Sequence, residues 1–196
     1  LEVFSHLQIA YLISLEIIKL KMLEENLQNI LNDHSKSFES VANQKQLIID
    51  ICSQCKKSIN LGGKIILCGN GGSAADSQHL AAELTGKFLR GEQPLPALSL
   101  TTDTSAITSI ANDFTFDEIF SRQLLALGLK NDTLIAISTS GESKNVINAV
   151  KVAKQLNIKT VSLTGKNGGT LSQISDFSFK VNSSNTARIQ EIHILV

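Results

Sequence analysis

Residues 64–84 read KIILCGNGGSAADSQHLAAEL and join the two patterns that decide the fold. The apolar run Lys64–Cys68 is typical of a buried strand, and Ala74–Leu84 has the apolar spacing of a helix. Glycines separate the two. A Gly-rich turn between a strand and a helix directs backbone N–H groups and the helix N-terminus at one point, which suits an anion such as phosphate.

The predicted helix carries two chemically active side chains on one face. His79 and Glu83 are four residues apart, which places an imidazole beside a carboxylate. An anion-binding turn next to an acid/base pair indicates chemistry on a phosphorylated small molecule. A capping box of Ser73 and Asp76 is the simpler structural explanation of the turn, and it is compatible with ligand binding.

Composition narrows the class of protein. The 196 residues fit one domain with its own core. Lys+Arg 18 against Asp+Glu 18 leaves no net charge, so nothing indicates binding to nucleic acid or to a membrane. An odd number of cysteines, three, argues against a disulfide framework and fits the cytoplasm. Cys52 and Cys55 form a lone C-x-x-C, for which we expect buried or half-buried thiols rather than a redox pair.

The first 21 residues are hard to interpret. Residue 1 is Leu, and the only methionine is Met22. The apolar stretch Leu7–Leu15 lacks a basic flank and a cleavage site and is too short to span a bilayer. We interpret residues 1–21 as a vector-derived or mis-assigned leader before a start at Met22. The alternative is an amphipathic helix that packs on a partner.

Residues 22–196 have the pattern of a single α/β domain. A helical segment, Met22–Asn60, precedes short apolar strands that alternate with helices, which predicts a doubly wound parallel sheet with helices on both faces. Ligands bind such sheets beyond the carboxyl ends of the strands. The predicted strands are Lys64–Cys68, Ala97–Leu100, Thr133–Ser138, Thr160–Thr164 and Phe177–Val181, and the predicted helices between them are Ala74–Phe88, Ser105–Leu127 and Val146–Leu156.

A second loop, STSGES at residues 138–143, follows the third predicted strand. Its four hydroxyl side chains stand next to a helix N-terminus and can bind a phosphate without a lysine. A Ser-rich turn with Ser143 as the N-cap is the structural alternative, but a cap explains one serine and not four. The first loop is not a nucleotide motif. The acidic residue that would bind a ribose does not close the second strand, where Asp103 is an imperfect candidate, and the loop has no Gly-Lys-Ser/Thr.

The order of these motifs resembles that of the sugar isomerase (SIS) domain family, and within it the phosphoheptose isomerases. The resemblance covers about Met22 to Val196. Its motifs are Gly69-Asn70-Gly71-Gly72-Ser73, His79-x3-Glu83-Leu84-Thr85-Gly86, Asn112-Asp113, Ser138-Thr139-Ser140-Gly141 and Arg188-Ile189-Gln190-Glu191.

The resemblance implies a five-stranded parallel sheet flanked by helices, a homotetramer and one zinc ion per subunit. It implies a ketose-aldose isomerase that converts sedoheptulose 7-phosphate to D-glycero-D-manno-heptose 7-phosphate in bacterial heptose biosynthesis. His79, Glu83 and Gln190 would bind the metal, and Glu83 would also transfer protons. The substrate would be bound by Asn70, Gly71, Gly72, Ser73, Asn112, Asp113, Ser138, Thr139, Ser140, Ser143 and Gln190.

The mechanism implied by the resemblance uses Glu83 as the base. It would take a proton from C1 and return it at C2 through a cis-enediol, and burial can raise a carboxyl pKa toward the working pH. Zinc would polarise the carbonyl group. Whether Glu83 acts as the base while it binds metal stays open.

One family feature is not matched. The family has a second histidine five residues after the one that corresponds to His193. That position lies past Val196, so we expect a truncated C-terminal helix.

Two other functions compete with the enzyme. One is a non-catalytic SIS protein, either a phosphosugar-binding module or an adaptor of the replication initiator. The metal and base set of His79, Glu83 and Gln190 favours the enzyme, because a binding module has no chemical need for it. A nicotinamide-dependent enzyme is the weaker alternative, for the reasons given at the first loop.

Overall fold

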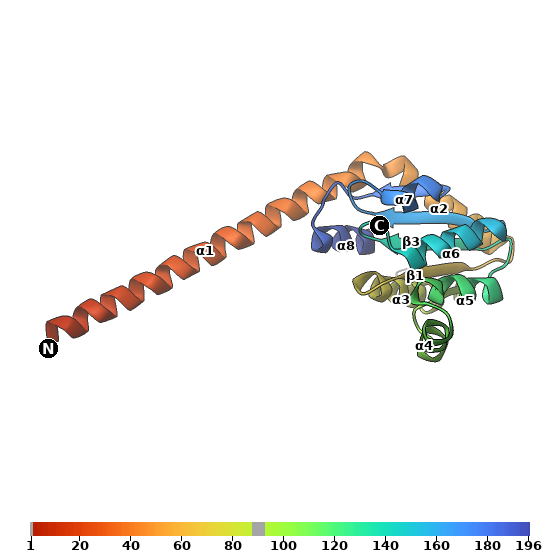
Figure 1. The fold of residues 1–196 in the computed structure, drawn as a ribbon. Coiled ribbons are helices and arrows are strands. Elements are labelled where there is room, and N and C mark those ends of the chain that lie inside the picture. Colours follow the sequence, from red (N-terminus) through yellow and green to blue (C-terminus); the bar gives the residue numbers. More distant parts are fainter. Residues whose placement is uncertain (1, 88–92) are drawn as a thin grey trace. The chain divides into compact units, whose positions relative to one another are not determined.

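The computed structural model describes residues 2–87 and 93–196, with the side chains of residue 11 and from residue 14 onward (Figure 1). Contacts divide the chain into two units, Leu1–Lys36 and Ser37–Val196. Helix α1 (Glu2–Asn43) begins in the first unit and passes through Met22 without a break. No helix in the described ranges is long and apolar enough to cross a membrane. The assignment of residues 1–21 to a leader stays a prediction.

The second unit is built on a five-stranded parallel sheet, as predicted. The strand order is β2-β1-β3-β4-β5, and every predicted strand is confirmed to within one residue at each end. The strands are β1 (Ile65–Gly69), β2 (Ala97–Ser99), β3 (Thr133–Ser138), β4 (Lys159–Thr164) and β5 (Phe177–Lys180).

Helices cover both faces of the sheet (Figure 1), which confirms the α/β fold class. Alternate side chains of β1 enter different cores: Ile66 and Cys68 pack on one face, and Ile65 and Leu67 on the other. The first face is covered by α4 (Thr104–Asp113), α5 (Ile119–Leu127), α6 (Lys144–Gln155) and α7 (Gly169–Ile174). The second is covered by α2 (Lys45–Asn60), α3 (Gly72–Thr85) and α8 (Thr186–Leu195).

Two predicted helices are interrupted. The helical segment Met22–Asn60 breaks at Gln44, whose side chain donates to the carbonyl of Lys180 (2.7 Å) and accepts from its N–H (3.2 Å). Gln44 thus satisfies the backbone of the edge strand β5. The predicted helix Ser105–Leu127 is broken after Asp113, and a short 3₁₀ turn, η1 (Phe116–Glu118), precedes α5.

The cause of the second break is local. Asn112 and Asp113 hydrogen bond to each other, and Asn, Asp and Thr favour local bonds or extended backbone over a helix interior. Thr115 is accordingly extended. Phe88, the last residue of another predicted helix, lies outside the described residues.

The strand order creates a binding crevice at one edge of the sheet. Strands β1 and β3 are neighbours, but α3 leaves β1 over one face while α6 leaves β3 over the other. The two helices therefore diverge from neighbouring strands, and this is the position where sheets of the order 2-1-3-4-5 bind ligands. Both candidate loops of the sequence follow these two strands.

Candidate functional site

The loop after β1 is shaped by glycine. Gly71 is the N-cap of α3 with φ +56°, a backbone conformation that favours glycine, and no side chain caps the helix. The predicted capping box of Ser73 and Asp76 is therefore wrong, because α3 begins at Gly72, before Ser73. In the described part of the chain, one buried oxygen of Asp76 has no hydrogen-bond partner. Burial raises the pKa of this carboxyl group, and the nearby His79 partly offsets the effect.

The two loops are joined by a pair of asparagines. Asn70 Nδ2 donates to Asn145 Oδ1 (2.8 Å), and Asn145 Nδ2 donates to Asn70 Oδ1 (2.9 Å). Asn145 is only 3% exposed, and its Oδ1 also accepts the N–H of Val146 (2.9 Å). The sequence analysis missed Asn145. Its polar side chain in the first turn of a helix, directly after the hydroxyl-rich loop, was the available signal.

Three hydroxyl groups of the second loop converge. Ser138 Oγ lies 3.0 Å from Ser143 Oγ and 3.4 Å from Ser140 Oγ, and it accepts the N–H of Gly141 (3.2 Å). We call Ser138, Ser140 and Ser143 the hydroxyl cup. Ser143 is at the N-cap position of α6, but its side chain makes no capping bond and turns to Ser138 instead. The alternative is thus confirmed for the position of Ser143 and wrong for the capping hydrogen bond.

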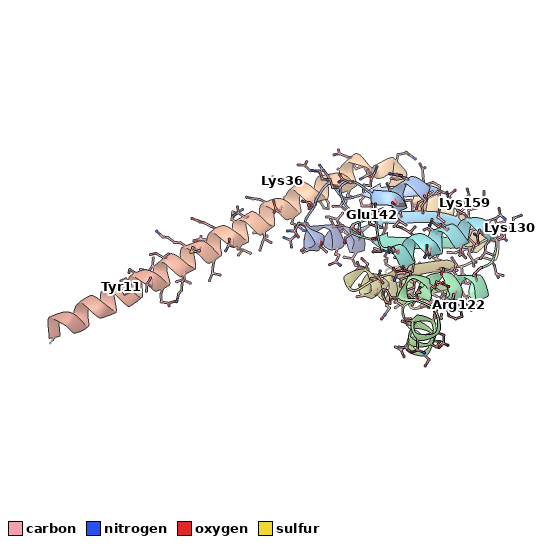
Figure 2. All side chains as sticks on the ribbon, viewed as in Figure 1. Tyr11, Lys36, Arg122, Lys130, Glu142 and Lys159 are labelled. Carbon is pink, nitrogen blue, oxygen red and sulfur yellow. The ribbon has the colours of Figure 1, made fainter. Side chains whose placement is uncertain are left out.

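Glu142, in the same loop, is turned away from the cup. Its carboxylate accepts the N–H of Thr170 (2.7 Å) and the Thr170 hydroxyl (2.9 Å), both at the start of α7. Figure 2 labels this side chain. The acidic residue closest in sequence to the cup is thus engaged in holding the loop to α7.

The C-terminal helix brings Gln190 to the first loop. The side-chain amide of half-buried Gln190 packs on Gly72, so that a Cβ at Gly72 would collide with Gln190 Nε2. Helix α8 is fixed at its start by Asn185, whose side chain accepts the N–H of Ala187 (3.0 Å). Two predicted site residues from opposite ends of the domain are thereby in contact.

His79 and Glu83 lie side by side on α3, as predicted. His79 Nε2 is 3.3 Å from Glu83 Oε1, and their side chains are 59% and 36% exposed. Both border a cavity of about 410 Å³ whose walls are mostly apolar side chains of α2, α3 and the sheet. The two side chains can occupy two coordination positions of one metal ion.

His193 lines the same cavity and is 1% exposed. Its Nε2–H donates to the carbonyl of Thr164 (3.1 Å), while Nδ1 is buried without a partner in the described residues. Burial lowers the pKa of His193 to about 4, and the bond to Thr164 only partly opposes this. The ring is therefore neutral at neutral pH.

Not every predicted site residue joins this arrangement. Asn112 and Asp113 lie at the exposed end of α4 and hydrogen bond to each other (2.8 Å). Within the described ranges, no hydrogen bond or ion pair links them to either loop. Thr139 does not belong to the hydroxyl cup but lines a second, polar pocket together with Ser140.

Two of the three predicted zinc ligands, His79 and Glu83, have a spacing that fits a metal ion. Two ligands of a tetrahedral zinc, each about 2.0–2.1 Å from it, lie about 3.3 Å apart, which is the His79–Glu83 separation. The third predicted donor, Gln190, contacts Gly72 at the start of the same helix. In the residues that the structure describes, no three His, Cys, Asp or Glu side chains gather around one point. The zinc site stays a prediction.

The C-x-x-C pair behaves only partly as expected. Cys55 is half-buried, and its burial, with a contribution from Cys52, raises the pKa of the thiol to about 11. Cys52 is exposed, contrary to the expectation, although it borders the same cavity as Cys55. A thiol with such a pKa is protonated at neutral pH, so Cys55 lacks the thiolate that redox exchange needs.

The chain is similar to known proteins along most of its length. The family model of the SIS domain matches residues 31–165. The phosphoheptose isomerase of Campylobacter concisus is 49% identical over 173 residues, which is 88% of this chain and 92% of that protein. That of Helicobacter pylori (strain Shi470) is 58% identical over 134 residues, 68% and 70% of the two chains. The structure of the phosphoheptose isomerase from Neisseria gonorrhoeae superposes with a TM-score of 0.83 at 41% identity, covering 88% and 94%.

Proposed function

The chain belongs to the phosphoheptose isomerases of the SIS domain family, and from this membership we propose that it converts sedoheptulose 7-phosphate to D-glycero-D-manno-heptose 7-phosphate for heptose biosynthesis. The observation that carries the proposal is the high identity to enzymes of this name across most of the chain. The hydroxyl cup at the end of β3 and the acid/base pair on α3 support it, since they are the groups that the reaction needs.

The reaction moves one proton between carbons. Glu83 takes a proton from C1 of the ketose, electrons shift into an enediol, and the proton returns at C2 to give the aldose. A second proton passes between the two oxygens, so the reaction has no net oxidation. His79, 3.3 Å from Glu83, fixes the orientation of the carboxylate.

The other end of the sugar is bound by the second loop. The three hydroxyl groups of the hydroxyl cup donate hydrogen bonds to the phosphate oxygens and hold the reacting carbons at a fixed distance from α3. The Asn70–Asn145 pair keeps the two loops in register, so binding energy at the phosphate positions C1 and C2.

We propose in addition that His79, Glu83 and Gln190 bind one zinc ion per subunit. The bound metal would supply Lewis-acid polarisation of the carbonyl oxygen. The His79–Glu83 spacing supports the proposal. Metal analysis of the purified protein should give about one zinc per chain, and His79→Ala should lower that ratio and the thermal stabilisation by added zinc. A wild-type protein without zinc affinity would contradict the proposal.

We further propose a homotetramer in the cytoplasm. Leu20, Leu23, Leu27 and Ile30 of the first unit are exposed at alternating steps of three and four residues, the spacing of helices that associate. The free cysteines suit a reducing compartment. Light scattering should give four times the 21.2 kDa chain mass, and Leu23→Glu with Leu27→Glu should reduce it. A monomeric mass for the wild type would contradict the tetramer.

The enzyme and the non-catalytic alternative differ in turnover. With purified protein and sedoheptulose 7-phosphate, NMR should show the aldose accumulate to equilibrium. A phosphosugar-binding module would bind the same compound and leave it unchanged. Identities of 47–58% to named isomerases favour turnover.

A further inference from the structure

A polar pocket of about 240 Å³ lies beside the hydroxyl cup. It shares Ser140 with the cup, and Thr139 stands next to Ser140 on its wall. The rest of the lining includes the segments that follow β4 and β5, with Lys166 from the first and Ser183 from the second. Hydroxyl groups dominate the lining, which therefore offers hydrogen bonds to a polar ligand.

The backbone holds Lys166 at this pocket from two sides. The N–H of the preceding Gly165 donates to the carbonyl of Thr139 (3.0 Å), and the N–H of Lys166 donates to the carbonyl of Ser183 (3.1 Å). Gly165 has no room for a side chain, since a Cβ there would lie 2.5 Å from the Thr139 oxygen. This close approach sets Lys166 next to the wall formed by Thr139 and Ser140.

Among the described residues that line the pocket, Lys166 has a charged side chain, and none of the others is a carboxylate. Among the residues with described side chains, none makes an ion pair or hydrogen bond with its ammonium group, and the carboxylate of Glu142 in the adjacent loop is bound by Thr170. An exposed lysine therefore borders a lining made mostly of neutral hydroxyl groups. Such a lining favours an anion.

We propose that Lys166 binds the phosphate group of the sugar phosphate from the side of this pocket, in concert with Ser140 of the hydroxyl cup. This inference rests on the proposed function. Hydroxyl groups satisfy the phosphate oxygens but leave close to two negative charges uncompensated at neutral pH. A lysine supplies the charge as a point cation, and charge-assisted hydrogen bonds are about twice as strong as neutral ones.

Kinetics of Lys166→Met test the proposal. We expect KM for sedoheptulose 7-phosphate, and the inhibition constant of inorganic phosphate, to rise roughly tenfold with kcat within about twofold of wild type. Added salt should raise KM of the wild type and leave that of the variant nearly unchanged. Lys166→Arg should recover most of the affinity. Lys151→Met, which removes an exposed lysine of α6 outside the pocket, is the matched control and should behave as wild type.

Direct binding of inorganic phosphate, followed by calorimetry, separates this proposal from the proposed function. If the wild type isomerises the sugar and Lys166→Met and Lys166→Gln bind phosphate as wild type does, the role of Lys166 is overturned and the isomerase stands. If the wild type does not isomerise the sugar but its phosphate binding depends on Lys166, the isomerase is overturned and the anion pocket stands. A wild type that neither isomerises the sugar nor binds phosphate overturns both.

Discussion

Asn70 and Asn145 bridge the crevice between the loops after β1 and β3 with two amide hydrogen bonds, of 2.8 and 2.9 Å. The two residues are 75 positions apart in the chain, and the helices that follow their strands lie on opposite faces of the sheet. The pair is therefore the direct link between the loop that leads to the acid/base pair and the loop that carries the hydroxyl cup.

Asn145→Ala should uncouple the two loops. It leaves the Asn70 amide and the N–H of Val146 without their partner, so we expect a loss of about 2 kcal/mol in the free energy of unfolding. Because substrate phosphate and reacting carbons are bound by different loops, kcat/KM should fall at least roughly tenfold. Urea unfolding and steady-state kinetics measure the two effects.

Asn148→Ala is the matched control for this change. Asn148 lies on the same helix and donates to the carbonyl of Asp117 (3.1 Å), away from both loops. It should cost comparable stability and leave kcat/KM unchanged. Equal kinetic losses in the two variants would show that the Asn70–Asn145 pair has no special role.

Gly72→Ala should move Gln190 at little cost in stability. The new methyl group meets the end of a flexible side chain, so we expect a loss of less than about 1 kcal/mol. Activity should fall because the Gln190 amide is displaced from the loop. Kinetics of a double-mutant cycle with Gln190→Ala check this: Gly72→Ala should have much less effect once Gln190 is absent. Additive losses would contradict the contact.

Stability should depend on pH through His193. Its pKa is about 4 in the folded chain and near 6.5 when exposed, so between these values the unfolded chain binds the additional proton. The contribution of the neutral ring is complete above pH 6.5 and is lost as the pH falls toward 4, at up to about 1 kcal/mol per pH unit.

Urea unfolding of the wild type and His193→Gln from pH 7 to pH 4.5 isolates this contribution. The glutamine keeps a donor for the carbonyl of Thr164 and cannot take up a proton. The difference in unfolding free energy between the two proteins should change with pH in the stated direction. A difference that stays constant over this range would show that His193 is not titrating.

Regular secondary structure was largely readable from the sequence. The strands are short runs of apolar residues bounded by glycine or polar residues, and such runs have few alternatives in an α/β pattern. The helix break at Gln44 was not readable in the same way. Gln44 hydrogen bonds to Lys180, which is 136 residues away, and no local sequence pattern predicts that hydrogen bond.

The candidate site was predictable in its loops and not in its contacts. Glycines and serines mark the two turns, and the turns meet because parallel strands end at one edge of the sheet. The contacts depend on three-dimensional packing. Asn145 was not predicted, Ser143 bonds Ser138 rather than its own helix, and Asn112 hydrogen bonds to its neighbour Asp113.

The measurement that tests the central claim most directly is the conversion of sedoheptulose 7-phosphate by the wild type, Glu83→Gln and the control Glu118→Gln, an exposed carboxylate at the start of α5. We predict that the wild type and Glu118→Gln convert the sugar. Glu83→Gln should turn over at least roughly 100-fold more slowly, because it lacks the base. A wild type without turnover, or Glu83→Gln at near wild-type rate, would contradict the account.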